Sequence, residues 1–363
     1  MYKNKLFIIA LIIITSLSSI NNSNAQNKTS KKPKNIIFLI GDGMATAQVY
    51  AALTIKKDKL NIARCRYIGF HKSYSASDYI TDSAAGGTAF STGQKTKNGC
   101  LAVDSMLHAF PTILELAEKR GLSTGLVSAC AVTHATPASF IAHVGKRDNY
   151  EEIANWYLKT DIDVFIGGGR NYFNQRQNKV NLLDSLKAKN YQIIDTITQL
   201  SKANSNGKIA GLLYSNHPPK MSEGRGDMLG ESSKKAISVL EKNKKGFFVM
   251  IEGSQIDWGG HDNNQEYMIT EMLDFDNVVG LMLDYAQKNR ETLVVITGDH
   301  ETGGLSLTGG NWNGGKFTAK FSTTDHSAVM VPVFAYGPGA EEFMGFMENT
   351  DIFNKFKKLI IDK

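Results

Sequence analysis

The chain has 363 residues, of which 42% are hydrophobic and 21% charged, and its formal net charge is +6. This is the composition of an ordinary globular protein with ample material for a hydrophobic core. The lysines and arginines are dispersed apart from short runs at 31–34 and 355–358, and no aromatic residues are interleaved with them. Such a distribution argues against nucleic-acid binding.

The first 25 residues have the pattern of a signal peptide. Lys3 and Lys5 form a positive start, residues 6–17 are mostly apolar, and residues 23–25 (Ser-Asn-Ala) form a small-x-small cleavage site. A transmembrane anchor is the alternative, but the apolar stretch is short for a span and polar sequence follows at once. We therefore expect a periplasmic or secreted protein without a stable membrane span. No cysteine lies in this segment, which argues against a lipid anchor.

Strand-like and helix-like segments alternate along the rest of the chain. After a polar leader at 26–34, the expected strands lie at 35–40, 122–128, 161–166, 247–251, 292–297 and, as the final strand, 329–336; the expected helices lie at 111–120, 231–242 and 265–287. Residues 81–93 are expected to be a loop entering a helix, and 309–316 a loop. The alternation predicts an α/β fold with a central, mainly parallel β-sheet sandwiched by helices on both faces. No long linker interrupts it, so 35–363 is expected to be a single catalytic domain.

Four of these strands run into ligand-type side chains or a glycine-rich loop. The strand at 35–40 leads to Asp42, the strand at 247–251 to Glu252, and the strand at 292–297 to Asp299 and His300. The strand at 161–166 leads to the loop Gly167-Gly168-Gly169-Arg170. In open α/β sheets the ligand site lies outside the carboxyl ends of the strands. Carboxylates and imidazoles gathered there make a hard-cation or zinc site. The pattern predicts a metallohydrolase.

Two further pairs of residues add ligands of the same kind. Asp257 and His261 lie four residues apart, within reach of one ion, and Asp325-His326 precedes the last expected strand. A lone histidine is more often structural, and Asp-His pairs are common on surfaces. Together, however, these side chains exceed what one zinc ion uses. Two neighbouring metal ions are therefore expected, an arrangement suited to in-line phosphoryl displacement.

Ser83 is the candidate nucleophile. It lies at an expected helix start, where backbone N–H groups and the helix dipole favour an approaching anion. No histidine neighbours it in the sequence, so a metal ion would have to stabilise its alkoxide. A helix-capping serine is the alternative, and the local sequence leaves both readings open. The Gly86-Gly87 pair that follows allows close approach of a backbone or ligand.

Thr136 and Arg147 follow another expected strand, in a segment that opens a helix near Pro137. An arginine offers a planar fork that grips a phosphate through two hydrogen bonds, although a surface arginine is the default reading. The Thr136 hydroxyl can ligate magnesium or cap the helix.

Taken in order, these segments resemble the alkaline phosphatase family. The resemblance is carried by Asn35 to Met44, Thr81-Asp82-Ser83-Ala84-Ala85 with Thr88 to Gly93, Ala135-Thr136-Pro137-Ala138 with Ala142-His143-Val144 and Arg147, Glu252 to His261, Thr297 to His300, and Asp325-His326. It implies the family fold. It also implies hydrolysis of phosphate monoesters to an alcohol and inorganic phosphate, through a phosphoserine intermediate at a site holding two Zn²⁺ and one Mg²⁺.

The same resemblance implies a role for each matching residue. Ser83 would be the nucleophile, and Arg147, oriented by Asp82, would clamp the phosphate. The first zinc would take Asp257, His261 and His326, and the second would take Asp42, Asp299 and His300. Asp42 would also bridge to a magnesium site completed by Thr136 and Glu252.

His134 and Trp258 resemble the combination found in compact, often marine or cold-adapted, bacterial members of the family. They stand where the best-known bacterial version has Asp and Lys. A nearby imidazole can recruit zinc or weaken magnesium, so the third site is expected to accept Zn²⁺ as an alternative. The large insertion that reaches a partner subunit is reduced to the region around 309–324. The family implies a homodimer, but this shortened region makes that expectation weaker for this chain.

Two other functions fit part of the pattern. A phosphodiesterase or nucleotide pyrophosphatase of the same superfamily would share the zinc ligands, but Arg147 and the Thr136–Glu252 pair favour a doubly charged monoester. A non-catalytic exported metal- or phosphate-binding protein would need no nucleophile, so the presence of Ser83 disfavours it.

The three cysteines, Cys65, Cys100 and Cys130, suggest no site of their own. None has CxxC spacing, and their odd number argues against a disulfide framework. One disulfide with a free thiol and three buried thiols are both compatible with the sequence.

Overall fold

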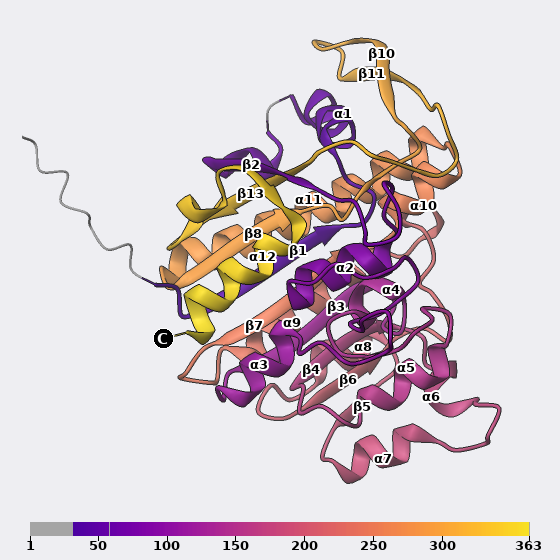
Figure 1. Ribbon diagram of the computed structural model, residues 1–363, viewed down its shortest axis with the longest axis vertical. Helices are drawn as coiled ribbons and strands as arrows, with labels where there is room; N and C mark the ends of the chain where they lie inside the picture. Colours follow the sequence, from indigo (N-terminus) through magenta and orange to yellow (C-terminus); the bar gives the residue numbers. More distant parts are fainter. Residues whose placement is uncertain (1–31, 58, 363) are drawn as a thin grey trace, which may run out of the picture. The chain divides into compact units, whose positions relative to one another are not determined.

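The centre of the fold is a ten-stranded sheet with the strand order β14-β2-β13-β8-β1-β7-β3-β4-β6-β5 (Figure 1). The structure is a computed structural model that describes residues 32–57 and 59–362, so the expected signal peptide at 1–25 lies outside the described residues. The sheet strands are β1 (Asn35–Gly41), β2 (Tyr67–Lys72), β3 (Ser123–Ala131), β4 (Val164–Gly168), β5 (Gln192–Ile194), β6 (Ile209–Leu212), β7 (Phe247–Gly253), β8 (Thr292–Thr297), β13 (Val331–Tyr336) and β14 (Gly345–Glu348).

Twelve α-helices accompany the strands in the described part of the chain. They are α1 (Thr46–Lys56), α2 (Ser83–Thr92), α3 (Ile113–Lys119), α4 (Ala135–Ala138), α5 (Tyr150–Trp156), α6 (Asn171–Asn174), α7 (Leu182–Ala188), α8 (Ile197–Lys202), α9 (Met228–Leu240), α10 (Ile256–His261), α11 (Gln265–Asn289) and α12 (Asn349–Phe356). Two small ladders lie outside the main sheet: β10 (Ser306–Asn311) with β11 (Lys316–Lys320), and β9 (Glu301–Thr302) with β12 (His326–Ser327).

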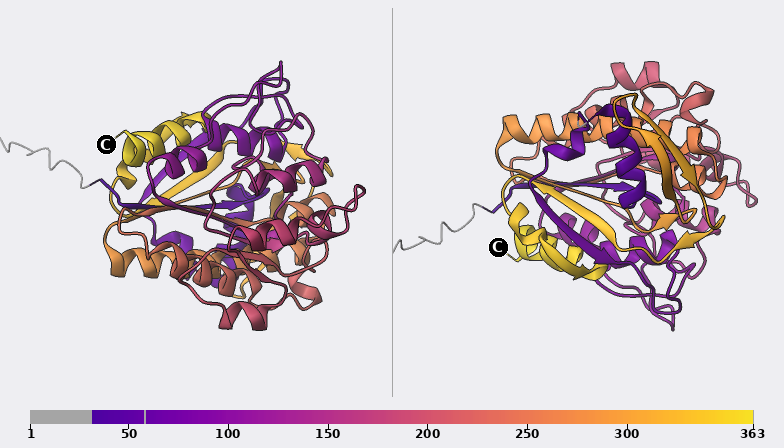
Figure 2. Two further views of the ribbon diagram at one scale, coloured as in Figure 1. Left: turned by 90° about the horizontal axis from the view of Figure 1, so that it is seen from below. Right: turned by 90° about the horizontal axis from the view of Figure 1, so that it is seen from above.

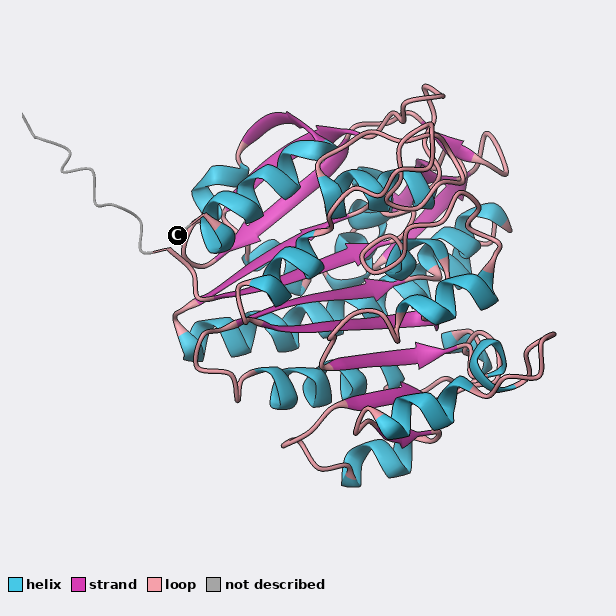
Figure 3. Ribbon diagram, turned by 60° about the horizontal axis from the view of Figure 1, so that its bottom comes forward, coloured by secondary structure: helices cyan, strands magenta, loops and turns pink. Residues whose placement is uncertain are grey.

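The main sheet is parallel except at one strand. β13 pairs antiparallel with both β8 and β2, whereas every other neighbouring pair in the sheet is parallel. Figure 3 shows these strands side by side between helices. The expected α/β class with a mainly parallel sheet is confirmed.

Helices cover both faces of the sheet, and β1 shows why its sequence is a continuous apolar run. Ile36, Phe38 and Ile40 point into one core with residues of α2, α3 and α12, whereas Ile37 and Leu39 point into a second core with residues of α1, α9 and α11. The two helix layers lie on opposite sides of the sheet in Figure 2. A strand covered on both faces buries all its side chains, so it lacks the polar alternation of a half-exposed strand.

The expected elements are found with small shifts of their ends, and two expectations are wrong. The segment 309–316 is not one loop, because only its middle is a turn and its ends belong to β10 and β11. Glycines at positions 309 and 310 leave these strands without an alternating apolar pattern, which hid the hairpin. The strand expected at 329–336 is not the last, since β14 follows it at the edge of the sheet.

The structure also shows the state of the three cysteines and the character of the helices. Cys65, Cys100 and Cys130 are all free, the first and last being buried. Across residues 32–57 and 59–362, no helix combines the length and the apolar character needed to span a bilayer.

His143, in the segment after α4, is held as a cation at the periphery of this framework. Its Nδ1 contacts the carbonyl oxygen of Ala102 at 2.9 Å, and its Nε2 contacts Glu115 Oε1 at 3.1 Å. Both partners are acceptors, so the ring must donate from both nitrogens and be protonated. Burial opposes this, but the hydrogen bonds to Glu115 and Ala102 raise the pKa of His143 above its ordinary value.

We expect the His143→Gln variant to lose stability in a pH-dependent way. A raised pKa means that the histidine's contribution is present below about pH 6.5 and is lost as the pH rises through the folded value. The Glu115 pKa is lowered, so its contribution requires a pH above about 4.5. The stability gap between wild type and variant should therefore be about 1 kcal/mol larger near pH 6 than near pH 9. Thermal melts at the two pH values measure it, and an equal gap at both would contradict a charged His143.

Candidate active site

Four neighbouring strands of the sheet bring their carboxyl ends to one place. In the order β8-β1-β7-β3, these ends carry Asp299 and His300 after β8, Asp42 after β1, Glu252 within β7, and Cys130 within β3. The expectation that ligand-type side chains meet at the carboxyl edge therefore matches the topology.

Asp257, His261 and His326 form the first cluster, with ligand atoms all within 4.8 Å of one another. Asp257 and His261 lie one turn apart on α10, and His326 comes from β12. The Oδ1 atom of Asp257 is 3.4 Å from Nε2 of each histidine, and the two Nε2 atoms are 3.2 Å apart.

The outer nitrogens of these two imidazoles are already committed to hydrogen bonds. Nδ1 of His261 donates to the carbonyl oxygen of Thr324 at 2.5 Å, and Nδ1 of His326 donates to that of Thr81 at 2.8 Å. The Nε2 atoms therefore converge beside a carboxylate while each Nδ1 is held by a backbone carbonyl oxygen, as in histidines that bind metals through Nε2. A hydrogen bond to Asp257 also raises the pKa of His261 to about 9, so the nitrogen readily holds positive charge.

Asp42, Asp299 and His300 form a second cluster that is completely buried. Nε2 of His300 lies 3.4 Å from Asp42 Oδ1 and 3.2 Å from Asp299 Oδ2. The other carboxylate oxygen of Asp42 makes no hydrogen bond. Burial, and then the charges of Asp299 and Asp257, raise the pKa of Asp42 well above its ordinary value. A divalent cation fits this set because uncompensated buried carboxylates are costly.

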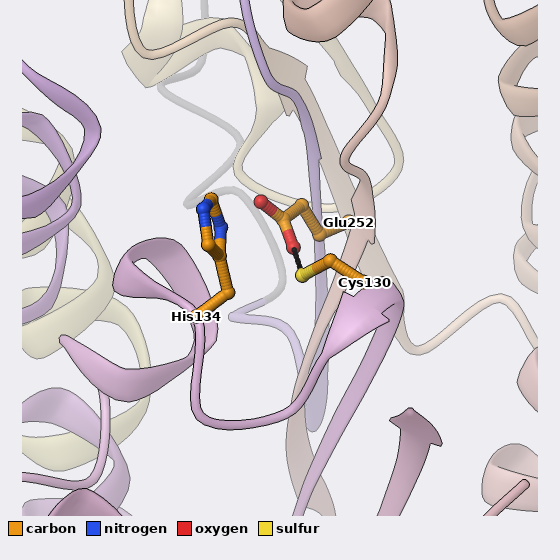
Figure 4. A group of neighbouring side chains, drawn as sticks. All are labelled: Cys130, His134 and Glu252. Atoms are coloured by element: carbon orange, nitrogen blue, oxygen red, sulfur yellow. Dashed lines mark hydrogen bonds between the residues drawn. The ribbon is translucent and has the colours of Figure 1, made fainter. Parts of the chain in front are cut away.

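Cys130, His134 and Glu252 form a third cluster, which the sequence did not indicate as a set (Figure 4). Glu252 Oε1, His134 Nδ1 and the nearby Thr136 hydroxyl are buried and make no hydrogen bond to any residue in the described part of the chain. Burial raises the pKa of Glu252 to about 7. Burial, together with the charge of Arg147, lowers the pKa of His134 to about 3, so its imidazole is neutral.

Ser83 is the first residue of α2 and does not cap it. The cap is Asp82, whose side chain accepts a hydrogen bond from the N–H of Ala85, and this decides between the two readings of the serine's local role. The Ser83 hydroxyl lies 3.2 Å from His300 Nε2 and 3.5 Å from Asp42 Oδ1. It therefore faces the second cluster from the start of a helix.

Arg147 forms an ion pair with Asp82, the residue before Ser83. Its Nη1 donates to Asp82 Oδ2 at 3.0 Å, and its Nη2 lies 3.5 Å from His134 Nε2. The same carboxylate oxygen accepts from the N–H of Gly99 at 2.9 Å. These contacts fix one edge of the guanidinium beside the start of α2, where Ser83 lies.

Two aromatic side chains surround His134. The rings of Trp258 and His217 lie 5.8 Å and 5.6 Å from it, centroid to centroid. His217 Nδ1 accepts from the backbone N–H of Ala131 at 3.0 Å. No motif in the sequence pointed to His217, which is an isolated histidine in the connection between β6 and α9.

Two sequence expectations do not reach the site. Asp325 is exposed and joins none of the three clusters, although its neighbour His326 does. Arg170, in the glycine-rich loop after β4, pairs with Asp195 instead. The loop's glycines are needed for packing, because a Cβ at Gly168 would lie 2.1 Å from the carbonyl oxygen of Asn216.

Comparison with known proteins agrees with this geometry. A family model described as alkaline phosphatase matches residues 33–320. The chain belongs to the alkaline phosphatase family. Alkaline phosphatase 4 of Bacillus subtilis is 31% identical over 99% of this chain and 97% of its own length, and the alkaline phosphatase of Escherichia coli is 30% identical over 92% and 87%.

Solved structures show the same relationship. The alkaline phosphatase from the Antarctic bacterium TAB5 is 43% identical, with a TM-score of 0.87 over 91% of this chain and 99% of that chain. A variant of the TAB5 enzyme in which a histidine is replaced by aspartate has Mg bound in its M3 site. The alkaline phosphatase fold expected from the sequence is confirmed.

We expect Gly43→Ala to disrupt the contact between the first two clusters. Gly43 has φ +76°, and an added Cβ would lie 2.7 Å from Asp257 Cα and 2.8 Å from the Thr302 hydroxyl. Phosphatase activity should fall by about 10- to 100-fold, because small displacements of a catalytic constellation are costly. Stability should fall by about 1–3 kcal/mol.

The matched control is Gly224→Ala. Gly224 has φ +90° with open space around the added Cβ, so it carries the backbone strain without the clash. Kinetics and thermal melts of both variants separate the two effects, and equal losses of activity would contradict the steric argument.

Proposed function

We propose that this phosphatase hydrolyses phosphate monoesters to an alcohol and inorganic phosphate through a phosphoserine formed on Ser83. The observation that carries the proposal is the position of the serine hydroxyl, free of any capping role and 3.2 Å from His300 in a buried cluster of metal-type ligands. Phosphoryl transfer depends on positioning and on charge stabilisation, and the residues around Ser83 supply both.

Residues of this chain would bind the phosphate and carry out the first displacement. The start of α2 directs backbone N–H groups toward the region where an anionic phosphate would approach Ser83. Arg147, held by Asp82, would grip the non-reacting phosphate oxygens. The Ser83 hydroxyl gives up its proton as its oxygen bonds to phosphorus, the ester P–O bond breaks, and the departing alkoxide takes up a proton to leave as the alcohol. Water then cleaves the serine–phosphate bond and restores the hydroxyl.

The proposed cofactors are two Zn²⁺ and one Mg²⁺. Asp257, His261 and His326 would hold one zinc, and Asp42, Asp299 and His300 the other. The donor sets fit, because the histidine lone pairs converge and a buried oxygen of Asp42 lacks a partner. When bound, such ions stabilise the serine alkoxide, the leaving group and the phosphate charge, and they supply hydroxide at mild pH.

Magnesium would be held by Asp42, Thr136 and Glu252. The Thr136 hydroxyl and Glu252 Oε1 are buried without hydrogen bonds, which suits an oxygen-preferring cation. His134 and Trp258 lie beside this position and would bias it toward Zn²⁺. The TAB5 variant with aspartate in place of a histidine and Mg in its M3 site is consistent with such a bias.

A phosphodiesterase or nucleotide pyrophosphatase would use a similar pair of metal sites. The Arg147 clamp favours a monoester, because its guanidinium adds positive charge for a dianionic phosphate, and a cation held at the third cluster would add more. A non-catalytic binding protein would not require Ser83 beside the second cluster.

The remaining proposals concern the protein's surroundings. We propose export by the signal peptide at 1–25 to the periplasm or medium, with residues 35–363 as the catalytic domain. Small phosphate monoesters would be the substrates, without nucleic-acid specificity. A homodimer is the proposed assembly.

Ser83→Ala should lower turnover of p-nitrophenyl phosphate by about 1,000-fold or more, because it removes the nucleophile. Ser91→Ala is the control, since Ser91 is a buried serine of the same helix that donates to the Ser139 carbonyl away from the clusters. The bis-ester should be a poor substrate for the wild type. Full turnover by Ser83→Ala would overturn the covalent mechanism, and faster hydrolysis of the bis-ester would favour a phosphodiesterase.

Asp82→Asn should separate the clamp from the helix cap. Asparagine caps helices well but carries no charge for Arg147, so the KM for a monoester should rise by about tenfold with little change in stability. Asp82→Ala should show the same kinetic change and also lose about 1 kcal/mol of stability. An unchanged KM in both variants would show that Asp82 does not position the clamp.

A further inference from the structure

Cys130 has a side chain that can bind a metal and lies at the site, but the proposed mechanism gives it no role. It lies in β3 and is completely buried, and its Sγ is 3.3 Å from Glu252 Oε2. Its ligand atom lies within 4.8 Å of those of Glu252 and His134. Figure 4 shows the three side chains converging from β3, from the turn before α4 and from β7.

The hydrogen bonds around this cluster satisfy one oxygen of Glu252 but not the other polar atoms that face the cluster. Glu252 Oε2 already accepts from the Ser254 hydroxyl at 2.6 Å, so it does not depend on the thiol. Among residues 32–57 and 59–362, Glu252 Oε1 and His134 Nδ1 have no hydrogen-bond partner, although the two residues are only 0% and 8% exposed. Buried polar atoms without partners call for an explanation, and a bound cation is one that serves both atoms at once.

The chemistry of the three donors indicates which cation. Sulfur, imidazole nitrogen and carboxylate oxygen are the ligands of zinc, and a thiolate selects soft or borderline metals. Magnesium prefers an all-oxygen set with several waters. Glu252 belongs to both sets, so the same carboxylate can face an oxygen-rich position with Thr136 or a sulfur- and nitrogen-rich position with Cys130.

We propose that Cys130 is a metal ligand, and that with His134 and Glu252 it makes the third metal position of this enzyme a thiolate-containing zinc site. The inference rests on the proposed third metal position. On binding, the S–H bond of Cys130 breaks, its proton passes to solvent and a sulfur–metal bond forms, without any change of oxidation state. The ring nitrogen of His134 binds as a neutral donor.

The test is the absorption spectrum of the full-length mature protein, stripped of metal and reloaded with Co²⁺. A thiolate bound to Co²⁺ gives a sulfur-to-metal charge-transfer band in the near ultraviolet, whereas nitrogen and oxygen ligands alone do not. We expect this band in the wild type and its loss in Cys130→Ser and Cys130→Ala. Cys65→Ser and Cys100→Ser are matched controls that should retain it, because neither thiol belongs to a cluster of ligand-type residues.

Zinc binding gives a second readout. The affinity for the third zinc equivalent, measured by competition with a chelator in the presence of Mg²⁺, should fall by about tenfold or more in Cys130→Ser. Loss of even an outer-shell partner costs about 10- to 100-fold in metal affinity, so loss of a ligand should cost at least as much. Cys65→Ser should bind zinc as the wild type does.

The outcomes distinguish this inference from the proposed function. Absence of the band in wild-type protein loaded with three equivalents of Co²⁺ overturns the role of Cys130, whether or not the variants fold. Persistence of the band in Cys130→Ser also overturns it. Neither measurement uses a phosphate ester, so failure of the phosphoserine mechanism in the Ser83→Ala assay would leave the metal result standing.

Discussion

The constraint on which the site depends is the burial of several carboxylates at one edge of the sheet. Asp42, Glu252 and Asp299 are completely buried, and Asp257 nearly so. Desolvation by burial, and then repulsion from Asp299, Asp257 and Glu252, raise the pKa of Asp42 well above its ordinary value. Such a group is stable only with positive charge among its members. The pKa values of His261 and His300 are raised, so these two imidazoles favour the charged form beside the carboxylates, and the proposed divalent ions would supply positive charge in their place.

A single side chain connects Ser83, the proposed nucleophile, to Arg147, the proposed phosphate clamp. Asp82 caps α2 through Ala85, accepts from the backbone of Gly99 and holds Arg147. The conformation of the helix start and the position of the guanidinium are therefore set by the same carboxylate. Because both depend on Asp82, Ser83 and the Arg147 guanidinium keep a fixed relative position without a direct hydrogen bond between them.

The sequence predicted the parts of the site that follow directly from strand ends and motifs. Asp42, Glu252 and Asp299 come at or just after long apolar runs, so their meeting at one edge followed from the parallel topology. Cys130 was missed because a buried cysteine in a strand looks like any small apolar residue. His217 was missed because nothing in its local sequence ties it to Ala131, a contact that only the folded chain creates. The hairpin β10–β11 was missed because glycines removed its alternation.

The reversed direction of β13 has a consequence for how the last histidine is delivered. Because β13 runs against its neighbours, the chain enters it at the edge where the parallel strands finish, and Val333 pairs with Thr297 near the end of β8. His326, a few residues upstream, is thus brought to the first cluster. It is also clamped, since the ladder of His326 with Thr302 closes the base of the excursion that carries β10 and β11. The segment between Thr302 and His326, which carries β10 and β11, can therefore change in length without moving His326 away from the first cluster.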